Sequence, residues 1–140
     1  MDKCTDELMQ ILCSKPNADN YLKENNNELL HKSLTELLQD YLISKNLQKS
    51  DVIRESNLDR VYAYQIFDSK HRPSRDKLLC LAFGLHLTVP ETQQLLKTAQ
   101  ISPLYPRIKR DVFILECLFQ EKNIFICNEN LESHGEPILQ

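Results

Sequence analysis

Four side chains between residues 60 and 65 could recognise a flat surface that carries hydrogen-bonding groups. Their spacing of i, i+1, i+4 and i+5 places them along one side of a helix: Arg60, Val61, Tyr64 and Gln65. A guanidinium offers a planar fork of donors, a primary amide offers both a donor and an acceptor, and valine offers an apolar contact. These groups match guanine, adenine and the thymine methyl in the major groove of DNA. The row therefore predicts contacts to base edges.

A second group of polar side chains could bind the phosphates on either side of such a groove. Two of them begin a predicted helix, where the helix dipole favours an anion, and three lie in or next to a basic loop over residues 69–73. Phosphates are the same at every base pair, so these residues would position the protein without selecting a sequence. The group comprises Lys49, Ser50, Lys70, Arg72 and Arg75.

The chain is mildly acidic as a whole but contains one basic segment. Its 140 residues carry a net charge of −3. Residues 45–78 hold eight basic and five acidic side chains, whereas residues 1–44 hold four and eight, and residues 79–140 hold five and seven. A DNA-binding protein needs positive charge only on its contacting face. The same distribution also fits a solvated face without a partner, so charge alone does not decide between them.

Other chemistry has weaker support in the sequence. No local spacing of carboxylates, or of serine or cysteine with histidine, indicates catalysis, so we expect no enzyme, no catalytic residue and no cofactor. The five cysteines include no C-x-x-C pair and the histidines are scattered, which predicts buried thiols and no metal site. His71, in the basic loop, fits a neighbour of phosphate better than a general base.

The N-terminus and the apolar runs predict a cytoplasmic protein without a membrane segment. Asp2, Asp6 and Glu7 stand where a signal peptide would be basic. The longest apolar run, near residues 112–115, is far shorter than the roughly 20 residues that a membrane helix needs.

Apolar residues at helical spacing predict an all-α protein. Four helix starts are marked by capping residues: Ser33, Asp59, Ser74, and Thr88 with Glu91 as a capping box. Asn57 suits the left-handed conformation at a helix end. The predicted helices cover residues 5–14, 19–24, 34–45, 49–56, 60–68, 75–85, 89–99, 109–121 and 126–134.

The helices over 49–56 and 60–68 are joined by only three residues, Asn57 to Asp59. Two helices with so short a link cross steeply, which is the geometry of a helix-turn-helix. Ala63 and Ile66 would face the first helix, and this leaves the opposite side of the second helix for a partner. Tyr64 could instead simply cover apolar surface, and Arg60 could be an ordinary solvated residue.

Segment 34–98 resembles the lambda-repressor-like helix-turn-helix domain of the xenobiotic-response-element (XRE/Cro) family. The resemblance is carried by the stretch from Asn57 to Ile66 and by the basic loop from Asp68 to Ser74, which ends in Arg-Pro-Ser. The extra terminal helices, with the Leu-Tyr-Pro connector and the Gly-Glu-Pro-Ile-Leu ending, are similar to those of bacterial members. The resemblance implies five helices, with the second and third contacting double-stranded DNA.

Several positions depart from the family pattern. Gln48 stands where the family has a capping Ser or Thr, and this costs roughly 0.5–2 kcal/mol of local stability. Ile53 and Ala63 exchange the small and large residues that the family has at these two positions. Phe67 and Ser69 replace a frequent Glu and Gly. These changes could tilt the helix that contacts bases.

Three regions follow from these patterns: an acidic helical arm over 1–32, the helix-turn-helix domain over 33–100 and a helical hairpin over 101–140. The arm could be a docking arm, a dimerisation element or a partly mobile tail. The hairpin echoes the segment before it at an offset of 35, since Arg75-Asp76 falls on Arg110-Asp111 and Leu104 on Leu139. Few positions match, so the sequence leaves open whether this is a repeat or a chance similarity of amphipathic helices.

Together these features predict a regulator of transcription that binds double-stranded DNA as a homodimer. Dimerisation is expected because a short recognition helix offers few base contacts, and two-fold symmetry doubles them. The terminal helices are candidates for that contact. The alternative is a protein-interaction module that uses the same fold without DNA and binds a partner through the N-terminal arm or the C-terminal helices.

Overall fold

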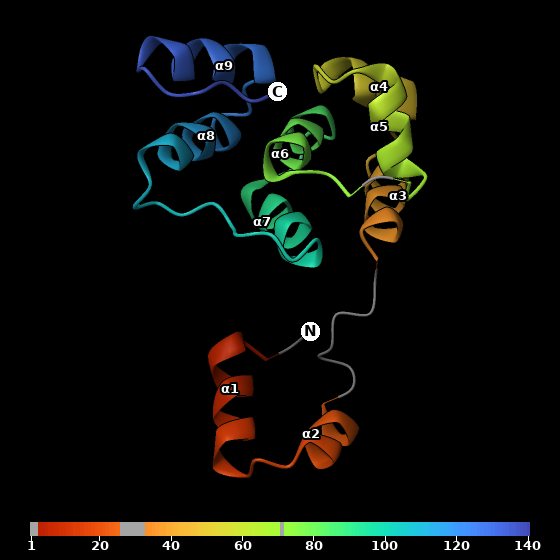
Figure 1. The fold of residues 1–140 in the computed structure, drawn as a ribbon, viewed down its shortest axis with the longest axis vertical. Coiled ribbons are helices and arrows are strands. Elements are labelled where there is room, and N and C mark those ends of the chain that lie inside the picture. Colours follow the sequence, from red (N-terminus) through yellow and green to blue (C-terminus); the bar gives the residue numbers. More distant parts are fainter. Residues whose placement is uncertain (1–2, 26–32, 71) are drawn as a thin grey trace. The chain divides into compact units, whose positions relative to one another are not determined.

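The computed structural model describes residues 3–25, 33–70 and 72–140, and within these ranges all regular structure is helical (Figure 1). This confirms the all-α prediction. His71 and the predicted domain boundary at residue 32 lie outside the described residues. Within the described ranges, every helix is too short or too polar to span a bilayer. The helices are α1 Thr5–Ser14, α2 Ala18–Glu24, α3 Leu34–Ser44, α4 Lys49–Glu55, α5 Arg60–Phe67, α6 Arg75–Gly84, α7 Val89–Thr98, α8 Lys109–Phe119 and α9 Ile124–Ser133.

The chain divides into two compact units, Met1–His31 and Lys32–Gln140. The first unit contains α1 and α2. Asn17 caps α2 by accepting a hydrogen bond from the backbone N–H of Asn20 at 3.0 Å, and the buried Asn25 accepts one from Lys3 Nζ at 2.7 Å. Neither helix has a buried residue, so this unit has little apolar core.

Capping side chains begin the helices of the second unit where the sequence predicts them. Ser33 accepts from the N–H of Glu36 at 3.2 Å, and Asp59 accepts from the N–H of Tyr62 at 3.1 Å. Thr88 forms the complete capping box of α7. Gln48 makes no capping bond through its side chain, as its residue type leads one to expect.

Several helices end earlier than predicted, because residues with positive φ stop them. Asn46 and Asn57 adopt φ values of 53° and 57° just after α3 and α4, so the prediction for Asn57 is confirmed. Glu121, predicted to lie in a helix, has a φ of 56°, and α8 ends at Phe119. The last helix begins two residues before the predicted start, because Asn123 caps it by accepting from the N–H of Ile126 at 2.9 Å.

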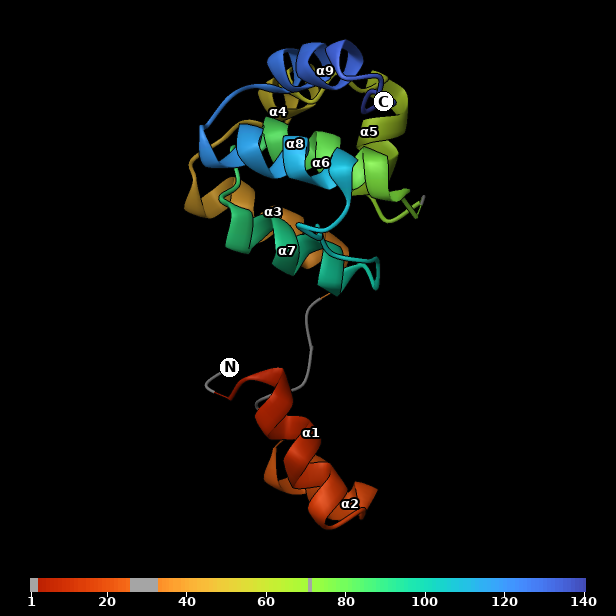
Figure 2. The ribbon, with the colours of Figure 1, turned by 90° about the vertical axis from the view of Figure 1, so that its left-hand side faces the viewer.

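Helices α3 to α9 share one hydrophobic core. Helix α4 packs on α6, α6 packs on α7, and α3 contacts both α5 and α7. Buried residues from Leu37 in α3 to Leu139 near the C-terminus belong to the same cluster, so the segments over 33–100 and 101–140 fold together. Figure 2 shows α6 and α8 in the middle of this unit, with α7 and α9 on opposite sides.

Two ion pairs join α6 to α8 in a reciprocal manner. Arg75 donates to both carboxylate oxygens of Asp111, at 3.0 and 2.8 Å. Arg110 donates to both carboxylate oxygens of Asp76, at 2.9 Å each. The arginines are 35 residues apart, and so are the aspartates. Each helix therefore gives the other the contact that it receives, as in an isologous, two-fold interface.

Two side-chain amides, also 35 residues apart, make equivalent hydrogen bonds in the two hairpins. Gln93 in α7 donates to the carbonyl of Leu104 at 2.8 Å and accepts from its N–H at 2.7 Å. Asn128 in α9 does the same to Leu139, at 3.0 and 2.8 Å. Each amide fixes the chain that follows its helix, eleven residues along.

The turns correspond as well. His86 and Glu121 end the first helix of each hairpin with φ values of 55° and 56°, and Gln100 and Gly135 end the second with 59° and 74°. Both pairs are 35 residues apart. Residues 75–104 and 110–139 therefore form a structural repeat of two helical hairpins.

Candidate nucleic-acid interface

Helix α5 buries one side and exposes the other. Ala63, Ile66 and Phe67 are at most 2% exposed and face the core. Arg60 is exposed and Val61 is 66% exposed, next to the cap provided by Asp59. The first turn of α5 thus presents a cation and an apolar side chain to solvent.

Arg60 is held over the ring of Tyr64, at 5.8 Å from its centroid. A cation over an aromatic ring at this distance is weakly attracted, and the contact limits the directions that the guanidinium can take. Tyr64 and Gln65 are both half-buried, and the carbonyl of Gln65 accepts from the N–H of Lys70 at 2.9 Å. The predicted base-contacting residues therefore include two that are exposed and two that are half covered.

A shallow hollow of about 360 Å³ lies between α4 and α5. It brings together three of the residues predicted from the sequence, namely Ser50, Arg60 and Tyr64. The remaining lining residues are Ile53, Arg54 and Leu58. Polar groups from two helices thus converge on one concave patch beside the exposed side of α5.

Arg54 belongs to this patch, although it is not among the residues predicted from the sequence. Its side chain is 71% exposed and pairs with Asp51 at 3.0 Å. A signal was present, since Arg54 lies in the basic segment and one helical turn after Ser50. Exposed ion pairs of this kind contribute at most about 1 kcal/mol, so the arginine can exchange its carboxylate for another anion.

The exchange of bulk between α4 and α5 is accommodated in the core. Ile53 is 4% exposed and Ala63 is fully buried. The large side chain comes from α4 and the small one from α5, so α5 can lie close to α4.

Three of the predicted phosphate-contacting residues lie at the ends of this helix pair. Lys49 is half-buried, with Nζ 5.1 Å from the centroid of the Phe67 ring, and Ser50 is exposed in the first turn of α4. Lys70 is exposed after α5, where Ser69 adopts a φ of 61° and shares a short hydrogen bond with Thr35.

The other two predicted residues face the C-terminal part of the chain. Arg72 is exposed, but its Nη2 donates to the carbonyl of Ala99 at 3.3 Å. Arg75 is only 23% exposed and donates to Asp111 and to the carbonyls of Ser102 and Pro103, at 3.1 and 2.9 Å. The guanidinium of Arg75 therefore holds α6 to α8, and we leave it out of the candidate interface.

The buried cysteines lie away from this patch. Burial raises the pKa of the Cys80 thiol to about 12, and burial together with the neighbouring Cys117 also raises the pKa of the Cys127 thiol. All three are fully buried, whereas Cys4 and Cys13 are exposed, so the predicted burial holds for three of the five. The thiols of Cys80 and Cys127 therefore stay protonated at neutral pH, and all three buried cysteines act as core side chains.

The candidate interface is thus the exposed side of α5, the hollow beside it and the basic residues at the two ends of the helix pair. No protein-family model, curated protein or solved structure matches the chain. What this surface does is therefore inferred from its own geometry and charge.

Proposed function

We propose that residues 33–100 form a lambda-repressor-like helix-turn-helix domain of the XRE/Cro type. In this proposal α4 and α5 are the helix pair, and α5 enters the major groove of double-stranded DNA. The protein would regulate transcription by binding particular sequences. The observation that carries the proposal is the division of α5 into a buried row and a solvent-facing row that begins with Arg60.

The base contacts would come from the first half of α5. Arg60 lies in the first turn, the part of a recognition helix that approaches base edges, and its fork of donors fits guanine. Val61, 66% exposed, can contact a thymine methyl. Gln65 and Tyr64 are half-buried and reach the groove only through their polar ends.

The phosphate contacts would come from both ends of the helix pair. Lys49, Ser50 and Arg54 belong to α4, and Lys70 and Arg72 follow α5. Four cations and a hydroxyl on two sides of the groove would fix the position of α5 on the duplex. The acidic remainder of the chain opposes non-specific binding, so these contacts would act only where the helix pair meets the groove.

The salt dependence of binding to a random duplex tests this proposal. With about four phosphate contacts, the logarithm of the binding constant should fall by about 0.9 per contact for each tenfold rise in salt. Lys70→Ala should reduce this slope by about one contact, because Lys70 is exposed beside α5. Arg107→Ala is the matched control, since it removes an exposed cation from the connector before α8 and should leave the slope unchanged.

Absence of binding at low salt would contradict the proposal. Equal slopes for Lys70→Ala and Arg107→Ala would contradict the assigned surface. Absence of binding would also favour the alternative, in which the same fold binds a protein without DNA.

A further inference from the structure

Helix α8 and the N-cap residue before it carry a row of apolar side chains on the outer side. They are spaced i, i+4, i+7 and i+11, and we call them the α8 stripe: Ile108, Val112, Leu115 and Phe119. Three of them are 49%, 43% and 72% exposed, and Leu115 is half-buried. Scattered apolar side chains are ordinary on a surface, but this spacing is that of a helix that packs along another helix.

In the first hairpin, the side of α6 that corresponds to the α8 stripe is covered by other helices. The positions 35 residues earlier are buried or half-buried: Pro73, Lys77, Cys80 and Gly84. Lys77 Nζ lies 5.3 Å from the ring centroid of Tyr62 in α5. At Gly84 a Cβ would collide with the carbonyl of Val52 in α4 and the hydroxyl of Ser56, which is the C-cap residue of α4. In the first hairpin this side is therefore covered closely by helices.

We propose that the α8 stripe is the surface through which two copies of this chain associate, with α8 of one copy packed antiparallel on α8 of the other. In the second hairpin a helix of another copy would thus take the place that α4 and α5 take in the first. This proposal rests on the repeat and on the stripe, and it does not require DNA binding.

The charges beside the stripe favour an antiparallel pair. Lys109 and Glu116 lie seven residues apart on the same edge of the stripe, and both are exposed. In an antiparallel pair, Lys109 of one copy faces Glu116 of the other, and symmetry makes this contact twice. Within its own chain Lys109 Nζ donates to the carbonyl of His134 at 3.3 Å and lies 3.7 Å from Glu136 Oε1. Its side chain is 65% exposed and an ammonium has three donors, so it can bind a second carboxylate.

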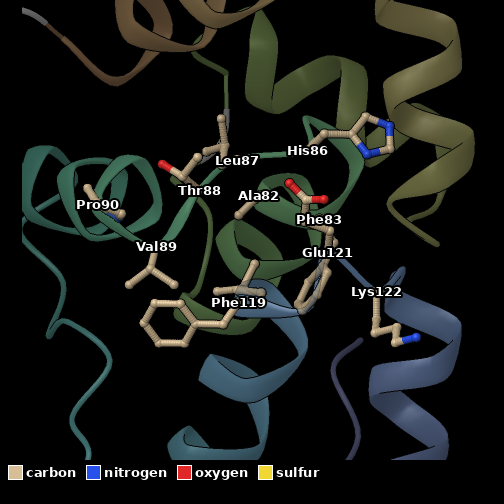
Figure 3. Close-up of a pocket in the computed structure, with 11 residues that line it drawn as sticks. Ala82, Phe83, His86, Leu87, Thr88, Val89, Pro90, Phe119, Glu121 and Lys122 are labelled. Carbon is tan, nitrogen blue, oxygen red and sulfur yellow. The ribbon is translucent and has the colours of Figure 1, made fainter.

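A hollow at one end of the stripe extends the surface. It has a volume of about 770 Å³, and Phe119 forms part of its wall next to Val89 (Figure 3). An 11-residue helix is only about 16 Å long, which is short for an interface of about 800 Å² per partner. In the antiparallel pair, Ile108 of one copy meets Phe119 of the other, so the 49% exposed Tyr105 reaches the hollow. Each copy would thus supply one aromatic side chain and one hollow.

Sedimentation equilibrium of the full chain, without DNA, tests the proposal. The unchanged protein should be a dimer, and Val112→Glu and Phe119→Glu should each be monomeric at the same concentrations. Phe125→Glu is the matched control, because Phe125 is 50% exposed on α9 and lies outside the stripe, and it should remain a dimer. Thermal unfolding of each variant shows whether the monomer is intact, since all three positions are exposed.

Charge reversal tests the antiparallel arrangement. Lys109→Glu and Glu116→Lys should each weaken the dimer, and the double variant should restore it. A protein that is monomeric throughout, or dimers that persist with glutamate at positions 112 and 119, would overturn the proposed surface. Failure of the double variant to restore association would overturn the pairing of Lys109 with Glu116. Because no DNA is present, these outcomes are separate from failure of the proposed function.

Discussion

The two hairpins, α6–α7 and α8–α9, make corresponding contacts with each other and within themselves. They differ in the helices that cover their outer sides. The reciprocal ion pairs and the two amide contacts are identical in kind. Helix α7, however, lies against α3, where Gln94 Oε1 accepts from the hydroxyl of Tyr41 at 2.8 Å. Glu129 in α9, 35 residues later, is exposed like Gln94, but α9 packs on α8 and α6. The contacts that the two hairpins share thus fix the hairpin structure. The residue types on the outer side of each hairpin depend on which helix packs against it.

The comparison also explains why the repeat is faint in the sequence. The two hairpins have identical residues where side chains join one hairpin to the other, as at Arg75 and Arg110. They are replaced where neighbours differ, since Gly84 lies under α4 and its counterpart Phe119 is 72% exposed. A repeat inside a protein can therefore be clear in its contacts when few residues are identical.

The two ion pairs between α6 and α8 should contribute unequally to stability, because one of them is more deeply buried. Asp111 is 1% exposed, accepts from Arg75 and also accepts from the N–H of Tyr105 at 2.9 Å, whereas Asp76 is 32% exposed. Asp111→Ala should lower the free energy of unfolding by about 3–5 kcal/mol, because it leaves Arg75 poorly solvated without its partner. Asp76→Ala should cost clearly less. Urea unfolding of both variants measures the difference, and equal losses would show that burial does not distinguish the pairs.

A smaller change in stability should distinguish the covered outer side of α6 from the exposed outer side of α8. Gly84→Ala should lower the free energy of unfolding by about 1–3 kcal/mol, since the added methyl meets the backbone of α4. At the matching position, Phe119→Ala should change the stability of the monomer by no more than about 0.5 kcal/mol. Both values come from chemical unfolding at a protein concentration low enough to exclude association. If the alanine at 84 were tolerated, α4 would not pack as closely as described.

The smallest change in stability at neutral pH is expected at Tyr41 in α3, which packs on α7. Burial, with smaller contributions from Glu91 and Asp40, raises the pKa of Tyr41 from 10.0 to about 12. The folded protein therefore favours the neutral phenol. Its contribution to stability is complete below pH 10 and is lost as the pH rises through 12. Tyr41→Phe should remove this alkaline loss, and unfolding free energies measured from pH 8 upwards for both proteins show whether it does. Parallel curves would mean that the phenol titrates equally in both states.

The sequence predicted local structure well and long-range partners poorly. Ser33, Asp59 and Thr88 mark helix starts correctly, because a cap depends on residues within one turn. Arg75 was expected at a phosphate because its neighbours are basic. Its actual partner, Asp111, lies 36 residues away, and only the fold brings the two together. The exposed side of α5 was predictable from its period, whereas the hollow with Arg54 depends on how α4 lies beside it.

Whether α5 recognises sequence is tested most directly by the affinity of Arg60→Ala for a DNA site obtained by selection from random duplexes. We expect this variant to bind the selected site about 1–3 kcal/mol more weakly while its affinity for random duplex changes little, because Arg60 would contact a base. Arg72→Ala should weaken binding to both DNAs by similar amounts, because Arg72 would contact phosphate. If Arg60→Ala bound the selected site as tightly as the unchanged protein, α5 would not be the helix that recognises sequence, and the proposed function would be wrong.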